Sequence, residues 1–565
     1  MKSLWLSALA ISCCLSGQVH ASRLTLMNTD PAGKGLNDPT PRTPVGDNPG
    51  RSVGEQRRIV YQYAADLWGS VLESDVDIIV GASFQDLRCL PTTGVLGSAG
   101  PAWVATSAPE ASSPGMLIHG PLANAMQGKR IDISDSGMDI ASRFNANLGG
   151  TNPDGSPCLT GLDWHYGLDG QAPQSGISFL DVVMHEMAHG LGFSGFVGYG
   201  NGRLGDRLGV PELYGYSDSY TQLAFDNLQG KPFADTTMTD AMRALSIRTP
   251  GAPSWSGPAA IAAARLWLRP SLQLVVEGGA APPLVTYNVG TAAFGPALPN
   301  NVFSGDLALA NDASGGDPAD ACEALPTDSL KGRIAFINRG SCDFEAKVAN
   351  AQAAGAVAAI IGNVASSPNP NSTLTMSDVE AYKATIPAIQ LTLADSDRIR
   401  AGLKSASLKA STTVAPNKRV GSDLAGRPLL YAPPEVEQGS SFSHFDYSAS
   451  PNVLMEPSAS DDTDAAHLVD LTLGTFADQG WTLNPGNARI GDCDTGVKLF
   501  KQPGLMAGAN VQAQDRVCRL SAKGSRVTYL RCMSDNAATL RSLQLINSIE
   551  QTAIRACAAK VIKLD

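Results

Sequence analysis

The sequence predicts an α+β chain in which one domain is interrupted by a smaller, β-rich α/β domain and is followed by a short helical region with disulfides. Three observations predict this architecture. Apolar residues recur at helical spacing in the first third of the chain, short apolar runs alternate with loops in the middle, and four cysteines cluster near the C-terminus. With 565 residues, 43% of them hydrophobic and 17% charged, the chain has the composition of several folded domains.

The N-terminus has the features of a secretory signal peptide. Residues 1–21 combine one early positive charge at Lys2 with an apolar stretch of about a dozen residues and small residues before Ser22, whereas a membrane span needs roughly 20 apolar residues. No later segment is a better candidate, so we expect no membrane span. A lipoprotein cleavage at Cys13 is the alternative, but Ala10 is a poor match to the usual Leu. The expected location is extracellular, or the periplasm.

Eight cysteines lie beyond this segment, and an even number in an exported chain predicts four disulfides. They fall into three local groups: Cys89 and Cys158; Cys322 and Cys342; and Cys493, Cys518, Cys532 and Cys557. The last four allow three pairings, which spacing alone does not resolve.

The net charge of −11, without any basic run, argues against a nucleic-acid partner. Protein or peptide substrates are the expected partners, and the oligomeric state is left open. Changes in composition divide the chain into a signal peptide (1–21), a first domain in two parts (22–268 and 411–484), an inserted domain (269–410) and a Cys-containing helical C-terminal region (485–565).

Hydrophobic periodicity predicts the main elements in chain order. A helix is expected over residues 55–72, followed by a strand over 76–80. A second helix is expected over 178–191, because Ser178 and Asp181 fit a capping box and glycines follow at its end. In the insert, strands are expected at 333–337, 357–361 and 386–391, with a crossover helix over 344–354.

The helix over 178–191 carries the sequence HExxH. Four residues turn a helix by about 400°, so His185 and His189 project from one face and can hold a single Zn²⁺. Glu186 lies beside them, where it can act as general base on a water that the metal activates. A catalytic zinc site also needs a third protein ligand and an open position.

The third ligand does not follow the pattern HExxHxxGxxH, since Gly195 stands where that pattern has its last His. Further along, Ser440–Asp446 (SSFSHFD) precedes Asn452–Pro457 (NVLMEP). This arrangement resembles the leishmanolysin-type metzincins, in which an insertion separates HExxH from the third His and a Met-turn follows. The resemblance implies that His444 is the third zinc ligand and that Met455 lies beneath the three histidines.

Other histidines provide alternatives. His467 is the rival third ligand, although it lies beyond the Met-turn, and His119 and His165 are expected to make only local hydrogen bonds. The acidic run Asp461, Asp462 and Asp464 could bind Ca²⁺, but an exposed acidic loop is the preferred interpretation, so no calcium site is predicted.

The insert has its own resemblance. Cys322, the run from Lys331 to Ile337 (KGRIAFI), Cys342 and the run from Ala353 to Gly362 (AAGAVAAIIG) are similar to the protease-associated (PA) domain. That resemblance implies a disulfide between Cys322 and Cys342, and contact with substrate or control of access to it.

Together these features predict a secreted zinc-dependent metalloendopeptidase that hydrolyses proteins with one catalytic Zn²⁺. Two alternatives remain. A secreted binding protein could use the PA domain on an inactive protease scaffold, although retention of Glu186 argues against this. A zinc aminopeptidase is the other, since some of those enzymes carry the same inserted domain, but no two-metal cluster of extra carboxylates is evident.

Overall fold

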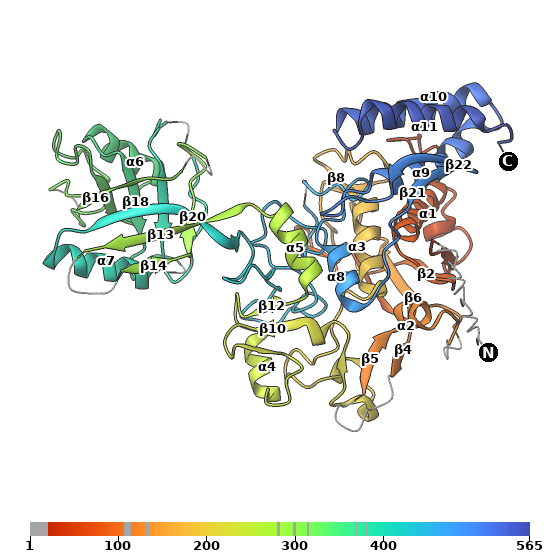
Figure 1. Cartoon of the computed structure of the whole chain (residues 1–565), viewed down its shortest axis with the longest axis horizontal. Helices are drawn as coiled ribbons and strands as arrows, with labels where there is room; N and C mark the ends of the chain where they lie inside the picture. Colours follow the sequence, from red (N-terminus) through yellow and green to blue (C-terminus); the bar gives the residue numbers. More distant parts are fainter. Residues whose placement is uncertain are drawn as a thin grey trace, which may run out of the picture. The chain divides into compact units, whose positions relative to one another are not determined.

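The computed structural model describes residues 21–106, 115–131, 136–278, 283–297, 301–313, 316–368, 370–379, 381–460 and 462–564. The predicted signal peptide, residues 1–21, lies outside the described residues except for Ala21. The chain forms two compact units, coloured along the sequence in Figure 1: Met1–Leu268 with Gly421–Asp565, and Arg269–Val420.

The first unit is built around a four-stranded sheet with the strand order β1-β2-β6-β3. Strands β1 (Leu24–Asn28), β2 (Ile78–Gln85) and β6 (Ile140–Asn145) run parallel, and β3 (Gly97–Pro101) closes one edge antiparallel to β6. Parallel strands need a crossover connection, which α1 (Val53–Val71) supplies between β1 and β2. The predicted first helix and strand are thus confirmed to within two residues at most ends.

Helix α3 (Phe179–Leu191) carries the HExxH sequence and packs against α1 and β3. It begins where predicted, because the Ser178 hydroxyl accepts a hydrogen bond from the Asp181 N–H at 3.2 Å. It ends at Gly192, whose φ of 145° is a conformation that side chains other than glycine rarely adopt. Its hydrophobic side chains are buried in the core of the first unit. The sequence therefore fixes both ends and the buried face of this helix.

Smaller elements surround this core. Before the C-terminal region, the remaining helices of the first unit are α2 (Gly120–Gln127), α4 (Asp240–Ser246), α5 (Pro258–Trp267) and α8 (Thr472–Gln479), with short 3-10 turns at η1 (Gly35–Asn37), η2 (Asp206–Leu208), η3 (Pro211–Leu213) and η4 (Thr221–Leu223). Its remaining strands before the C-terminal region are β4 (Val104–Thr106), β5 (Met116–His119), β7 (Asp163–His165), β8 (Gly176–Ser178), β9 (Ser217–Asp218), β10 (Ala224–Asp226), β11 (Lys231–Pro232) and β12 (Pro253–Trp255).

Asp478 in α8 ties this helix to the N-terminus of α5. Its carboxylate accepts hydrogen bonds from the N–H groups of Ala259 and Ala260, at 2.8 and 3.0 Å, and from the Trp255 indole at 3.0 Å. We expect Asp478→Ala to destabilise the first unit by about 2–4 kcal/mol, because a helix cap and a buried donor lose their acceptor together. Urea unfolding of the variant measures this loss. Asp86→Ala, at an exposed position, should leave the transition unmoved, and an equal shift in both variants would contradict the role of Asp478.

The C-terminal region packs on the first unit. It consists of a hairpin, β21 (Asn487–Ile490) and β22 (Cys493–Lys498), and the helices α9 (Ala507–Ala522), α10 (Arg526–Ser542) and α11 (Ser548–Lys560). The hairpin was not predicted. Its buried side chains belong to the same core cluster as those of α1 and α3. Residues 485–565 are therefore part of the first unit, and not a separate body.

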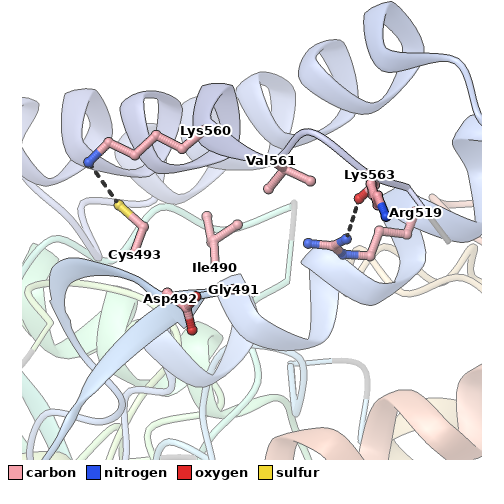
Figure 2. A pocket seen from close by; sticks show the side chains of 8 residues that line it. All are labelled: Ile490, Gly491, Asp492, Cys493, Arg519, Lys560, Val561 and Lys563. Atoms are coloured by element: carbon pink, nitrogen blue, oxygen red, sulfur yellow. Dashed lines mark hydrogen bonds between the residues drawn. The ribbon is translucent and has the colours of Figure 1, made fainter.

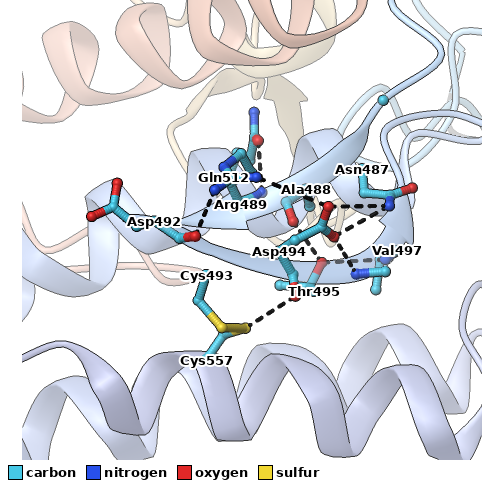
Figure 3. Close-up of polar contacts among 12 residues, drawn as sticks. Asn487, Ala488, Arg489, Asp492, Cys493, Asp494, Thr495, Val497, Gln512 and Cys557 are labelled. Carbon is cyan, nitrogen blue, oxygen red and sulfur yellow. Dashed lines mark hydrogen bonds and ion pairs between the residues drawn. A yellow bond between two sulfur atoms is a disulfide. The ribbon is translucent and has the colours of Figure 1, made fainter.

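Gln512 in α9 links the hairpin to the first helix. Its side-chain carbonyl accepts from the Arg489 N–H at 2.9 Å, and its amide donates to the Ser70 hydroxyl at 2.9 Å. Figure 3 shows the Arg489 contact beside the disulfide between Cys493 and Cys557, which ties the hairpin to α11. These links join α1 near the N-terminus to the hairpin, α9 and α11 of the C-terminal region.

Four disulfides join all the cysteines beyond the predicted signal peptide, as expected. They pair Cys89 with Cys158, Cys322 with Cys342, Cys493 with Cys557, and Cys518 with Cys532. The pairing of Cys322 with Cys342 that the PA resemblance implied is confirmed. Such a set is typical of proteins that mature in an oxidising compartment outside the cytosol. Among the described residues, no helix is both long and apolar enough to cross a membrane.

The second unit contains one eight-stranded mixed sheet in the order β14-β13-β20-β16-β17-β18-β19-β15. Its elements are β13 (Pro270–Glu277), β14 (Leu284–Thr286), β15 (Val289–Gly290), β16 (Ser304–Leu309), β17 (Ile334–Asn338), α6 (Phe344–Ala353), β18 (Ala358–Gly362), β19 (Ala388–Leu391), α7 (Leu393–Ser405) and β20 (Lys409–Arg419). The three predicted strands and the crossover helix correspond to β17, β18, β19 and α6. The unit ends at Val420, ten residues beyond the predicted boundary at 410, because β20 pairs along β13.

Candidate metal centre

Three histidines from distant parts of the first unit meet at one point. His185 and His189 lie one turn apart on α3, and His444 follows 255 residues after His189, once the chain has returned from the second unit. Their Nε2 atoms lie 3.0 Å (His185 to His189), 3.1 Å (His185 to His444) and 3.1 Å (His189 to His444) apart. The structure therefore brings the three sequence-predicted histidines together.

The second nitrogen of each ring is bound to a backbone carbonyl. Nδ1 lies 2.7 Å from the Leu454 oxygen in His185, 2.7 Å from the Phe193 oxygen in His189, and 2.8 Å from the Ser440 oxygen in His444. A carbonyl can only accept, so each Nδ1 carries the proton. In each neutral ring the Nε2 atom then carries a lone pair, and this lone pair is directed at the Nε2 atoms of the other two histidines.

Burial keeps these rings neutral. It lowers the pKa of His185 to about 4, and it lowers the pKa of His189 and His444 well below the usual value, with further lowering from the neighbouring histidines. Three neutral imidazoles with converging lone pairs repel one another unless a cation lies between them. This is the donor set that zinc takes in proteins, with the second nitrogen of each ligand held by an outer partner.

Glu186 is buried beside the histidines and faces the edge strand β3. The Ala99 N–H hydrogen-bonds to its carboxyl group, while its Oε2 has no partner among the described residues. Burial raises the pKa of Glu186 to about 8, although the Ala99 hydrogen bond and the charge of Arg143 act in the other direction. Gly97 allows the close approach, because a Cβ there would lie 2.9 Å from the Glu186 Cγ.

Met455 is fully buried near this group, in a tight segment before α8. Its carbonyl accepts from the Phe445 N–H at 2.8 Å, which ties it to the residue after His444. The Leu454 N–H donates to the buried Asp470 carboxylate at 2.7 Å. Because the Leu454 carbonyl also holds His185, this segment fixes the position of one ring.

The three histidines and Glu186 open into a cleft of about 540 Å³. Its walls come from residues 94–99 around β3, from α3 and Ser194, from η2, and from the segments 438–444 and 454–460 with Thr463. Two arginines, Arg143 and Arg207, also line it. A second cavity of about 420 Å³ lies in the C-terminal region, lined by Arg519, Lys560 and Lys563 among others, and Figure 2 shows it. It shares no lining residue with the cleft.

The other sequence-predicted candidates lie elsewhere. The Nδ1 of His467 pairs with Asp464 at 2.8 Å, and His467 is not among the histidines that meet. His119 is not among the converging histidines, and its hydrogen bonds are not local in sequence: they reach the hydroxyls of Ser194, on the cleft wall, and Ser219, at 2.9 and 3.5 Å. Of the acidic run considered for Ca²⁺, Asp461 lies outside the described residues, and Asp462 accepts from the Asn452 side chain at 2.9 Å.

Several residues of the cleft were missed from the sequence. Arg143 and Arg207 are isolated in the sequence, and neither belongs to a motif. Ser443 was noted only as part of a Ser-rich stretch, yet its hydroxyl accepts from the Gly195 N–H at 3.2 Å and so holds the segment after α3 against the His444 segment. The run of small residues in β3 (GSAGP) gave no signal that this strand would border the site.

Comparison with known proteins identifies part of the chain. Residues 303–399 match the PA domain family. No curated protein matches the chain. Among solved structures, the aminopeptidase from Aneurinibacillus sp. strain AM-1 is 25% identical over 26% of this chain and 31% of that chain, with a TM-score of 0.18.

Two further solved structures show the same partial likeness. The zinc aminopeptidase BSAP from Bacillus subtilis is 20% identical over 28% of this chain and 37% of its own, with a TM-score of 0.19. The Peptidase M28 precursor from Shewanella amazonensis is 18% identical over 27% of this chain and 40% of its own, also at 0.19. The aligned parts thus span well under half of these proteins, and scores this low say nothing about the first unit.

The structure and the comparisons confirm part of the predicted fold: the chain is a mixed α/β protein with disulfides and a PA domain. They do not support the predicted metzincin-like fold of the first unit, which stays a proposal. The second unit of the chain is built around a PA domain, over residues 303–399.

Proposed function

We propose that the protein is an exported zinc-dependent endopeptidase, with one Zn²⁺ on His185, His189 and His444 and with Glu186 as general base. The observation that carries this proposal is the convergence of three Nε2 atoms within 3.1 Å of one another beside a buried carboxyl group, in an open cleft. Tetrahedral zinc with Zn–N bonds of 2.0–2.1 Å spaces its ligands about 3.3 Å apart, close to these distances.

The three histidines fit zinc and leave a position open for chemistry. Zinc bound there would acidify a water molecule and polarise the carbonyl group of a peptide bond. Glu186 takes the proton of the attacking water on its free Oε2 and later delivers it to the nitrogen of the leaving amine. The raised pKa that burial gives to this carboxyl suits a group that must both accept and return a proton. No covalent intermediate with the protein is needed.

The leishmanolysin-type metzincin assignment belongs to this proposal. The sequence resemblance supports it through the distant third His and through Met455, placed eleven residues after His444. The role of Met455 as a floor beneath the metal is proposed on the same ground. The four disulfides support export, which fits an enzyme that acts on proteins outside the cell.

The two alternatives make different demands on the site. A binding protein on an inactive scaffold has no chemical use for Glu186. An aminopeptidase with two metals needs a second set of ligands next to the first, and the described residues contain only one other possible cluster, Asp312, Asp320 and Glu323, which lies in the second unit. Endopeptidase activity with one metal is therefore the function that the cleft supports best.

Cleavage of end-blocked peptides tests this function. We expect N-acetylated, C-amidated, internally quenched peptides of about ten residues to be cut at internal bonds, and o-phenanthroline to stop the reaction until Zn²⁺ is restored. Mass spectrometry of the products locates the cut. Cleavage that requires a free N-terminal amine would favour the aminopeptidase, and zinc binding without any cleavage would favour the binding protein.

A further inference from the structure

Two arginines reach the cleft from different walls. Arg143 lies on β6 next to the edge strand β3, and its charge acts on Glu186. Arg207 lies in η2, in the segment after α3, and its charge acts on His189 and His444. One guanidinium group therefore lies close to the general base, and the other lies close to the histidines.

Neither arginine has a carboxylate partner among the described residues. No carboxylate forms an ion pair with either side chain among the residues that the structure describes, and both side chains are exposed. The Arg207 Nη1 donates to the Gly195 carbonyl at 2.8 Å and to the Ser443 hydroxyl at 3.1 Å, and its guanidinium lies 4.2 Å from the Tyr199 ring centre. These contacts fix the orientation of the group but occupy one of its three nitrogens, so the others remain for a ligand.

The acidic residues on the cleft wall do not offset these charges. Besides Glu186 they are Asp181, which accepts from the Ala465 N–H at 2.9 Å, and Glu456, which accepts from the Val453 N–H at 3.1 Å. Both carboxyl groups thus accept hydrogen bonds from backbone N–H groups. Burial raises the pKa of each to about 7, so their negative charge is incomplete at neutral pH. Among the described residues of the cleft wall, the two guanidinium groups therefore lie with carboxyl groups whose pKa burial raises, in a protein whose net charge is −11.

We propose that the cleft selects peptides with acidic side chains close to the scissile bond, and that Arg143 and Arg207 bind their carboxylates. This rests on the proposed function and adds the class of substrate. A guanidinium group matches a carboxylate in both charge and geometry, and two parallel N–H···O bonds make the pair specific as well as stronger than a neutral hydrogen bond. Local positive charge within an acidic surface also guides an acidic segment to this cleft rather than to the rest of the protein.

Matched peptides test the proposal. The peptides are end-blocked and internally quenched, and each pair differs only by Glu or Gln at one position. Two positions on either side of the cut are tested in turn. For each position, the kcat/KM of the Glu peptide is divided by that of the Gln peptide. We expect a Glu-to-Gln ratio of about ten or more at one position or more, falling as NaCl is raised. Arg143→Met and Arg207→Met should each bring the ratio at an affected position close to one.

Control variants separate recognition from structure. Arg207→Lys keeps the positive charge but loses the forked set of N–H donors, so this variant should retain part of the preference for Glu. It therefore tests the role of the charge even if Arg207→Met disturbs the segment that Arg207 holds. Arg531→Met, at an exposed position on α10, should keep the full ratio. A ratio near one in the unaltered protein, or an unchanged ratio in Arg143→Met and in both Arg207 variants, would overturn the proposal.

A binding measurement keeps this test independent of turnover. Fluorescence anisotropy gives the Kd of the same labelled Glu and Gln peptides on the zinc-loaded Glu186→Gln protein. We expect the Glu peptide to bind about ten-fold more tightly. If this holds while the unaltered protein cuts no peptide, the proposed function fails and the selection of acidic segments stands. Equal Kd values would reject the selection whether or not peptides are cut.

Discussion

Glu186→Gln is expected to lower kcat by about 10²–10⁴-fold while the protein keeps one zinc per chain. The amide has nearly the shape of the carboxylate, so it preserves the packing against β3 but cannot take a proton from water. Zinc should remain bound, because Glu186 is not one of the three converging groups. Elemental analysis and hydrolysis of an end-blocked peptide, run on the same sample, measure both quantities.

Two controls sharpen this result. Glu456→Gln changes another buried carboxyl on the cleft wall, outside the proposed proton path, and is expected to keep a much larger share of kcat than Glu186→Gln. Thermal unfolding of both variants shows whether they fold. Undiminished activity in folded Glu186→Gln would remove this residue from the mechanism, and loss of zinc would mean that it supports the metal instead.

His444→Ala is expected to lose both metal and activity. Two histidines on one helix turn leave zinc with too few protein ligands, so the affinity should fall by at least about 100-fold, more than loss of an outer partner costs. Competition with a chromophoric chelator measures that affinity in the purified protein. His467→Ala is the matched control, because His467 was the rival ligand and lies outside the group that meets.

The outcomes of this pair differ clearly. Zinc lost from His444→Ala and kept in His467→Ala would establish the divided site. Zinc kept in His444→Ala would place the third ligand elsewhere and remove the basis of the metzincin assignment. Zinc lost from both variants, with folding intact, would point to an indirect effect through the segment 454–470 and would require the ligands to be identified by spectroscopy.

The sequence predicts best where the governing interactions are local. Helix α3 could be placed because its cap at Ser178, its apolar stripe and its terminal Gly192 all lie within fifteen residues. The strands of the second unit could be placed because buried parallel strands are continuous apolar runs. In both cases the residues that decide the structure are neighbours in the chain.

The sequence predicts less where distant segments meet. Nothing in the spacing singles out His444 from the other histidines, and it was found only through a family resemblance. Arg143 and Arg207 enter the cleft because of how β6 and η2 lie in the folded unit, and no local pattern marks them. The predicted end of the insert at residue 410 falls inside β20, which was not predicted, because the pairing of β20 with β13 depends on a partner more than a hundred residues away.

The packing of α9 on α1 has a consequence for the order in which the chain folds. The Asn510 side chain donates to the Tyr63 hydroxyl at 3.0 Å across 447 residues, and the Gln512 amide reaches Ser70 in the same way. The face of α1 that α9 covers therefore stays uncovered until residues 507–522 have left the ribosome. A chain exported as it is made would keep this apolar face exposed to chaperones and proteases for most of its transit, and the first unit would become resistant to them only when its last helices arrive.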